Sequence, residues 1–303
     1  MRILVIGDTH GNTKFLCDYL YPIACNIGAG AIVQLGDFGY WEQAPEGVQF
    51  LDDVAGAAHH FEIPLYWLHG NHDKHSMIAG RYTGRTVDGF IAVRPRVNYI
   101  PQGFCWTWAG VSMRAFGGAY SVDKQWRLDE EAKRYKKLSY KEGKRRAVGL
   151  EPKSIPPTAG TLWFPEEQMT DAEFAELLAA DSDRKDIVFS HDKPRGSNPG
   201  LELKNEPECL PNQDRLQRAL CIHKQKLWLH GHLHHRYTDW VRYGDGAADW
   251  TRVAGLGPDS QAAMRFWRPT DSWCVLDLHS PQSIDLTPGA DAEEWYEHPR
   301  KAA

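Results

Sequence analysis

The sequence predicts an α/β fold built on a parallel β-sheet, and the order of its first elements is the main observation. Two segments with helical composition, at about 13–27 and 46–60, each lie between short apolar runs. A strand–helix–strand–helix–strand order implies parallel strands joined by right-handed crossovers. The second observation is that apolar runs of strand length recur along the chain, at 3–6, 31–35, 65–68, 187–189 and 227–229.

The remaining segments add further strands and two helices to this prediction. Residues 90–116 contain short aromatic-rich runs broken by glycines, which is typical of antiparallel hairpins. Thr170 is expected to begin one helix, and Asn212 is expected to cap another that continues through Leu220. Further strands are expected at 236–243, 250–254 and 273–278.

Composition is that of an ordinary globular protein. The chain has 303 residues, of which 42% are hydrophobic and 25% charged, so it can bury one large core. Its net charge of −5 does not predict nucleic-acid binding over the whole surface. The six cysteines show no paired spacing and are expected to be reduced thiols. With no signal-peptide pattern and no apolar stretch of about 20 residues, we expect a cytoplasmic protein without a membrane partner.

Polar residues with metal-binding side chains follow each of the five apolar runs. These five ligand blocks are Asp8-Thr9-His10, Gly36-Asp37, Gly70-Asn71-His72-Asp73, Ser190-His191-Asp192 and Gly231-His232-Leu233-His234. In open α/β sheets, the ends of buried strands are where the chemistry is placed. One such block would mean little, because a lone histidine after a strand is usually packed or solvated. Five in succession predict a single assembled metal centre.

The side-chain types narrow the choice of metal. Carboxylate, amide oxygen and imidazole, with no thiolate, suit Mn, Fe, Zn, Co or Ni. The blocks offer more ligands than one tetrahedral zinc can use, and a carboxylate has two oxygens that can each bind an ion. The sequence therefore favours two metal ions that share one bridging carboxylate.

The order and spacing of the five blocks resemble those of the calcineurin-like metallophosphoesterases. The resemblance extends from residue 2 to about residue 235 and leaves one large region between the third and fourth blocks unexplained. It implies a four-layer α/β/β/α sandwich, in which two mixed β-sheets are flanked by helices. We expect this domain to occupy 1–279, with an insertion at about 120–163 and a peripheral tail at 280–303.

The resemblance also implies a role for each residue of the blocks. Asp8, His10 and His234 would hold the first metal, and Asn71, His191 and His232 the second. Asp37 would bridge both ions. His72 would protonate the leaving oxygen after attack by a metal-bridging hydroxide, and Asp73 would fix the tautomer of His72. We expect Mn²⁺ first, with Fe, Zn, Ni and Co as alternatives.

The unexplained insertion is basic within an acidic protein. Residues 124–146 contain ten Lys or Arg against four Asp or Glu. The acidic run at 129–131 followed by Lys133 and Arg134 gives helix-supporting pairs, so a solvated helix is the first expectation. The alternative is a cap over the metal site that attracts phosphorylated substrates or nucleic-acid strands.

The second block bears on the class of substrate. Protein Ser/Thr phosphatases of this superfamily carry Gly-Asp-x-x-Asp-Arg-Gly there, whereas this chain has Tyr40 in place of the Asp and Trp41 in place of the phosphate-binding Arg. A diester carries less charge than a dianionic monoester and has a poor alkoxide leaving group that needs an acid. We therefore expect a phosphodiesterase for cyclic nucleotides or small nucleotide diesters.

Trp41 and Tyr40 are candidates for stacking on a nucleobase, although an aromatic pair beside a strand is more often part of the core. Three other functions stay open at this stage. A Ser/Thr protein phosphatase would prefer monoesters, and a DNA nuclease would use the basic insertion. A non-catalytic scaffold is disfavoured, because no predicted ligand and no acid is missing. The oligomeric state is open.

Overall fold

The computed structural model describes residues 1–156, 158–200, 207–246, 248–259 and 268–279. Twelve strands in this part of the chain form two six-stranded sheets. The first sheet has the order β12 (Trp273–Asp277), β1 (Arg2–Ile6), β2 (Ala29–Gln34), β3 (Leu65–Trp67), β5 (Val97–Tyr99) and β4 (Ile91–Arg94). The second has the order β10 (Tyr237–Arg242), β11 (Trp250–Gly255), β9 (Leu227–His230), β8 (Ile187–Ser190), β7 (Val111–Phe116) and β6 (Cys105–Trp108).

Both sheets are mixed, as expected. β1, β2, β3 and β5 are parallel to one another, and so are β7, β8, β9 and β11. Antiparallel pairs close each sheet, with β12 beside β1, β4 beside β5, β6 beside β7 and β10 beside β11. The hairpins predicted for 90–116 are therefore present, but one lies in each sheet. The chain changes sheets between Tyr99 and Cys105.

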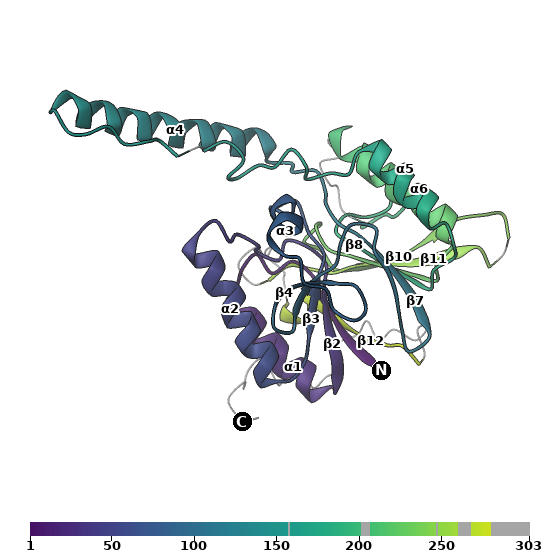
Figure 1. Ribbon diagram of the computed structural model, residues 1–303. Coiled ribbons are helices and arrows are strands. Elements are labelled where there is room, and N and C mark those ends of the chain that lie inside the picture. The colour runs from purple at the N-terminus through teal and green to yellow at the C-terminus, as the bar shows by residue number, and fades with distance from the viewer. Residues whose placement is uncertain (157, 201–206, 247, 260–267, 280–303) are drawn as a thin grey trace.

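Helices cover the outer faces of the two sheets (Figure 1). The first sheet carries the helical segment η1 (Phe15–Leu20) and α1 (Tyr21–Asn26), together with α2 (Pro45–His60). The second carries α5 (Asp171–Ala180) and α6 (Leu210–His223). Three short helices lie in connections, namely α3 (Ser76–Arg81), η2 (Pro207–Cys209) and η3 (Pro269–Ser272).

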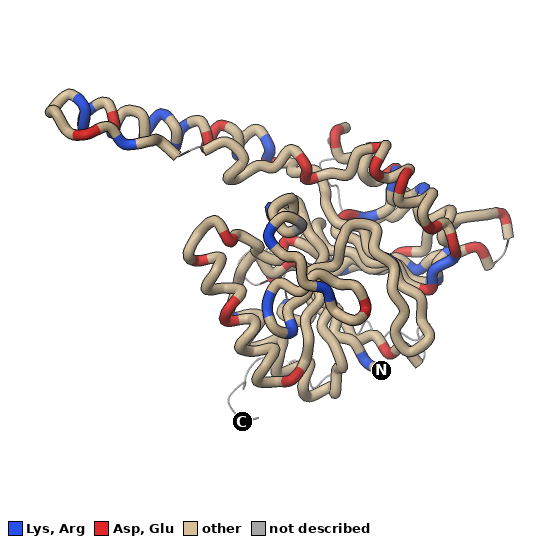
Figure 2. The backbone as a smooth tube through the Cα atoms, viewed as in Figure 1, with Lys and Arg blue, Asp and Glu red and all other residues tan. Residues whose placement is uncertain are grey.

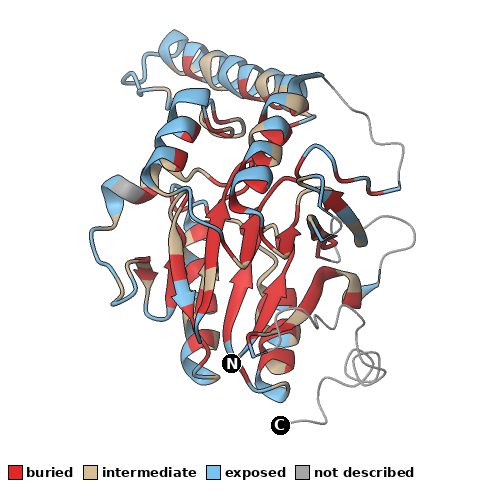
Figure 3. Cartoon of the chain, turned by 90° about the vertical axis from the view of Figure 1, so that its right-hand side faces the viewer, coloured by how far each residue is buried: buried red, intermediate tan, exposed pale blue. Residues whose placement is uncertain are grey.

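The alternation of side chains along the strands produces the four layers. Leu4 and Ile6 of β1 pack with the helices on the outer face, whereas Ile3 and Val5 pack between the two sheets. Successive residues of a strand point to opposite faces, so a strand covered on both sides is apolar throughout. Figure 3 shows the central strands buried along most of their length, with exposed segments on the helices, the loops and the sheet edges. The expected α/β/β/α sandwich is confirmed.

Two predictions about helix starts have different outcomes. Thr170 caps α5 as predicted, with a reciprocal pair of hydrogen bonds between Thr170 and Glu173. The prediction for Asn212 is wrong, because α6 begins at Leu210 and Asn212 lies inside its first turn. The Asn212 amide instead donates to the Gly118 carbonyl at 3.3 Å and to the Asp192 carboxylate at 3.1 Å. It ties α6 to the loops that follow β7 and β8.

The basic insertion forms the long helix α4 (Lys124–Ala147), which extends away from the sheets as an arm (Figure 1). The chain returns along the helix, and two buried glutamates hold it there. Glu131 accepts hydrogen bonds from the amides of 161–163, and Glu142 accepts one from the amide of Lys153. The expected helix is thus present. The expected tail, 280–303, lies outside the described residues, and no helix among the residues described is both long and apolar enough to cross a membrane.

Candidate metal centre and active site

All five ligand blocks lie where parallel strands end. They follow β1, β2 and β3 in the first sheet and β8 and β9 in the second. Within each sheet these strands are neighbours that run in the same direction, so their carboxyl ends share one edge. Because the two sheets pack face to face, the loops from both edges meet at one place.

Asp37 lies at the centre of this cluster, and its two oxygens face different neighbours. Oδ2 is 3.6 Å from Nε2 of His10, and Oδ1 is 3.5 Å from Nε2 of His191. His10 comes from the first sheet and His191 from the second. A carboxylate approached from two sides in this way has the geometry required to bridge two ions.

The remaining predicted ligands divide into two groups around Asp37. On one side, Nε2 of His234 is 3.1 Å from Asp8, and both lie with His10 in a group whose ligand atoms are all within 4.8 Å. On the other side, Oδ1 of Asn71 is 3.0 Å from Nε2 of His191. The ring centroid of His232 is 5.0 Å from that of His191. The residues predicted for each metal therefore lie close together, and two further groups, His10 with Asp37 and His72 and Asp8 with Asp37 and His191, are equally compact.

Several residues of the ligand blocks have a strained backbone, and one glycine lies very close to a predicted ligand. His10, Asp37, His232 and His234 all have a positive φ, between 45° and 65°, which non-glycine residues rarely adopt. Such strain persists only where the surrounding structure fixes it, and it clusters at functional sites. A Cβ atom at Gly70 would collide with the Asp37 carboxylate, which explains the glycine at the start of the third block.

The negative charge of two buried carboxylates at the centre of the cluster favours the binding of cations. Asp8 and Asp37 are each 1% exposed, and burial opposes ionisation of both. His72, His191 and His10 outweigh this effect and hold the pKa of Asp37 well below its usual value. Buried carboxylates are stable when paired or bound to metal. The two buried anions, the imidazoles and the Asn71 oxygen form a donor set that fits two divalent ions.

A family model described as calcineurin-like phosphoesterase matches residues 1–236. The chain belongs to the calcineurin-like phosphoesterase family. The family and the His/Asp groups together support phosphoester hydrolysis at a metal site.

Solved structures with a similar arrangement are distant in sequence. The crystal structure of phosphopantetheinyl hydrolase from Mycobacterium tuberculosis gives a TM-score of 0.39 at 16% identity, covering 84% of this chain and 89% of that chain. A hypothetical protein from Thermus thermophilus gives a TM-score of 0.36 at 13% identity, covering 85% of this chain and 75% of that chain. No curated protein sequence matches the chain.

His72 of this phosphoesterase lies half-buried at the edge of the cluster. Its Nε2 is 3.6 Å from Oδ2 of Asp37, and its ring meets that of His10 edge-on with centroids 5.6 Å apart. Burial, aided by the nearby Arg127, lowers the pKa of His72 to about 4 in the protein without substrate. The neutral ring accepts a hydrogen bond from the Arg127 guanidinium.

Asp73 does not have the position expected for it. Its two oxygens accept four backbone N–H bonds of 2.9–3.0 Å, from Phe38, Gly39, Tyr40 and Gly70. Asp73 therefore holds the loop of the second block against the third, and through that loop it places Asp37. The expectation that Asp73 fixes the tautomer of His72 is corrected, because the hydrogen bonds of Asp73 in the described structure go to these four amides.

Tyr40 and Trp41, the candidates for stacking on a base, differ in exposure. Tyr40 is fully buried, stacks on Trp67 with centroids 5.4 Å apart and donates its hydroxyl to Glu42. It belongs to the core and has no face free for a ligand, so that part of the prediction is wrong. Trp41 is 37% exposed.

Two residues of the site were missed by the sequence reasoning. The buried Asp259 follows β11 and accepts from Asn12 at 2.7 Å, and its other oxygen is 3.3 Å from Nδ1 of His10. A carboxylate on Nδ1 fixes the tautomer that leaves Nε2 for a metal. The position of Asp259 shortly after a strand is the sequence signal that would have identified this residue. The other missed residue is Arg127 in the insertion, for which the sequence carries no such signal.

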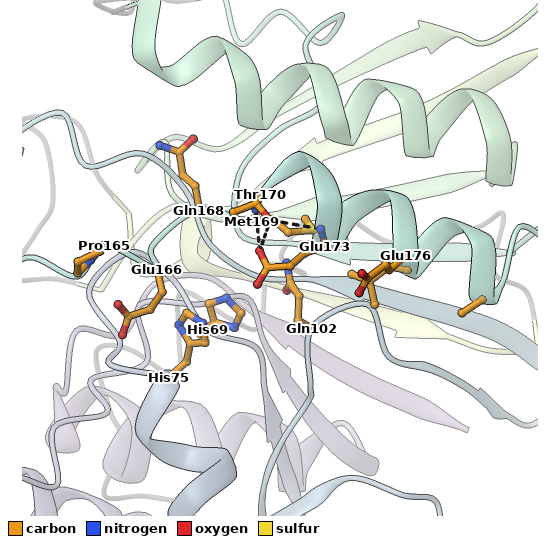
Figure 4. Close-up of a pocket in the computed structure, with 12 residues that line it drawn as sticks. His69, His75, Gln102, Pro165, Glu166, Gln168, Met169, Thr170, Glu173 and Glu176 are labelled. Atoms are coloured by element: carbon orange, nitrogen blue, oxygen red, sulfur yellow. Dashed lines mark hydrogen bonds between the residues drawn. The ribbon is translucent and has the colours of Figure 1, made fainter.

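A cavity of about 490 Å³ lies on the far side of the third block, between that block and α5 (Figure 4). His69 and His75 stack there with ring centroids 3.7 Å apart, and His69 bonds the Tyr99 hydroxyl at 2.8 Å. Burial lowers the pKa of both imidazoles, so they are neutral packing groups. None of the residues lining the cavity is a predicted ligand.

Proposed function

We propose that this phosphoesterase is a two-metal phosphodiesterase acting on small nucleotide diesters or cyclic nucleotides. The observation that carries the proposal is the placing of His72 beside the Asp37 carboxylate, at the edge of a double ligand cluster. That arrangement suits a substrate whose leaving oxygen must be protonated as the bond to phosphorus breaks.

The chain's residues fit two ions, for which Mn²⁺ is our first expectation. Asp8, His10, His234 and Asp37 would hold one, and Asn71, His191, His232 and Asp37 the other. When bound, the ions supply a water of lowered pKa and stabilise the charge of the phosphoryl oxygens. Asp259 orients His10 for this task, and Asp73 fixes the loop that carries Asp37.

His72 supplies the proton in this proposal. A bound phosphoryl group is anionic, and an opposite charge within about 4–6 Å favours the protonated form of an imidazole. The effect that lowers the pKa of His72 in the free protein is thus opposed once substrate is present. An alkoxide leaving group, as in a nucleotide diester, gains most from such an acid.

The presence of Trp41 at this position favours a diester substrate over a monoester. It occupies the motif position where protein phosphatases of this superfamily keep an arginine, and a half-exposed indole cannot pair with a dianion. Its exposed face suits stacking on a base. A protein phosphatase is accordingly not favoured.

The test is a panel of substrates with Mn²⁺-loaded protein. We expect higher kcat/KM for 2′,3′-cyclic or 3′,5′-cyclic nucleotides than for the matching monoesters. Trp41→Ala should lower kcat/KM for a nucleotide diester by an amount that corresponds to about 1–3 kcal/mol. The loss for a diester without a base should be much smaller. Preference for monoesters or phosphopeptides would overturn the diester proposal. Equal losses on all substrates would mean that Trp41 only packs.

A second candidate, cleavage of single-stranded nucleic acid, is favoured by one surface of α4. Five exposed lysines lie on the side of this helix opposite the buried Glu131 and Glu142, and we call them the lysine face: Lys133, Lys136, Lys137, Lys141 and Lys144. Figure 2 shows basic segments along the arm, with acidic segments between them. The exposed Tyr140 lies among the lysines and offers a ring for a base.

If the lysine face holds a strand, replacing Lys136, Lys137 and Lys141 with alanine should weaken binding of a single-stranded oligonucleotide. The slope of log K, the logarithm of the binding constant, against log salt concentration should decrease in magnitude by about 2. Each lost phosphate contact removes about 0.7 from this slope. The matched control replaces Arg2, Arg85 and Arg184, which are exposed and remove the same charge. Equal effects of the two triple variants would show that only net charge matters, and no binding by the wild type would remove this candidate.

A further inference from the structure

The insertion places one buried cation directly against the acid of the site. Arg127 on α4 is 3% exposed, and its Nη2 contacts the ring of His72. The nitrogen that it contacts most closely, Nε2, is the one that faces the Asp37 carboxylate at 3.6 Å. The guanidinium is thus separated from the metal-ligand cluster by a single imidazole.

The other donors of Arg127 are fixed by the base of the arm. Nε forms an ion pair with Asp123 at 2.8 Å, and Nη1 donates to the Leu162 carbonyl at 3.2 Å. Leu162 is itself positioned, because its amide donates to the buried Glu131 at 2.7 Å. Two anchored nitrogens determine the plane of a guanidinium. The third, Nη2, is therefore aimed at His72 before any substrate arrives.

We propose that Arg127 is a phosphate-binding guanidinium of this active site, supplied by the insertion. Nη2 carries two hydrogens in the guanidinium plane, and the one not directed at His72 can donate to a phosphoryl oxygen bound beside the imidazole. A preorganised guanidinium binds such an oxygen with little reorganisation. This inference rests on the proposed phosphoesterase site, and it holds for a diester or a monoester.

The test uses inorganic phosphate as the probe, with binding to the metal-loaded protein measured by calorimetry. Arg127→Ala should weaken phosphate binding by about 10- to 100-fold, the usual effect of losing a charge-assisted hydrogen bond. The matched control is Arg134→Ala on the exposed side of the same helix, which removes the same charge and should change binding less than about twofold. Metal content and far-UV circular dichroism establish that each variant is folded and loaded.

Arg127→Lys decides the case if Arg127→Ala does not fold. It keeps the charge but cannot hold Asp123, Leu162 and an oxygen together, so phosphate binding should still weaken by several-fold. Unchanged phosphate affinity in a folded Arg127→Lys or Arg127→Ala variant would overturn the inference, as would an equal loss in Arg134→Ala or no phosphate binding by the wild type. If phosphate binding depends on Arg127 but no diester is cleaved, the proposed diesterase function fails and the role of Arg127 stands.

Discussion

Replacing Asp37 with alanine is expected to remove nearly all phosphoester hydrolysis, a loss on the order of 10⁴ or more, as when a group on which a whole site depends is deleted. Its oxygens face His10 at 3.6 Å and His191 at 3.5 Å, so under the proposed bridging role both metal positions would lose the same anionic ligand. Metal content should fall from about two ions per chain to one or fewer. Elemental analysis of the purified variant together with kcat on a nitrophenyl diester measures both effects.

Asp37→Asn provides a second test with the shape of the side chain kept. The amide oxygen can still accept the 2.8 Å hydrogen bond from the backbone of His72, so the loop should stay in place while the charge is lost. Asp88→Ala, at an exposed position, is the control and should keep both metals and activity. A folded Asp37→Ala protein with full metal content would show that Asp37 does not bridge.

His72→Ala is expected to slow cleavage of a nucleotide diester by about 10²–10⁴, the usual contribution of a positioned proton donor. The metals should remain, because the ligands proposed on the two sides of Asp37 do not include His72, although His10, Asp37 and His72 also lie close enough to hold an ion. A nitrophenolate leaving group needs little protonation, so the loss on a nitrophenyl diester should be much smaller. The quantity to measure is the loss of rate on the nucleotide diester divided by the loss of rate on the nitrophenyl diester.

The control for this experiment is His235→Ala, which removes an imidazole three residues beyond His232 that stacks on Tyr237. It should leave both rates close to those of the wild type. Equal losses on good and poor leaving groups in His72→Ala would mean that His72 positions the substrate and does not supply the proton. Loss of metal from that variant would instead make His72 a ligand.

The five ligand blocks could be predicted because each depends on local sequence. An apolar run long enough for a strand, then a glycine or small residue, then a carboxylate or histidine, can be recognised without knowing the fold. Parallel order adds that the strand ends meet at one edge. The structure confirms the two mixed sheets, and it brings Asp8, His10, Asp37, Asn71, His191, His232 and His234 together.

The partners of these residues could not be predicted in the same way. The sequence suggested that Asp73 pairs with its neighbour His72, but its oxygens accept from backbone amides, three of which lie 33–35 residues away. Tyr40 and Trp41 are adjacent, yet Tyr40 is fully buried while Trp41 is 37% exposed. Of two adjacent aromatic residues in a loop, one can point into the core and the other toward solvent. The residue types alone do not indicate which of the two is buried.

The sequence by itself determined the α/β order of the elements, the ligand types and the family, because periodicity and side-chain chemistry are properties of short segments. Only the tertiary structure decided which distant residues complete the site. Asp259 reaches His10 across 249 positions, and Arg127 reaches His72 across 55, from a helix that sequence analysis could describe only as basic. Such contacts depend on how loops fold over the sheet edge. That is set by the packing of both sheets together, and no single segment encodes it.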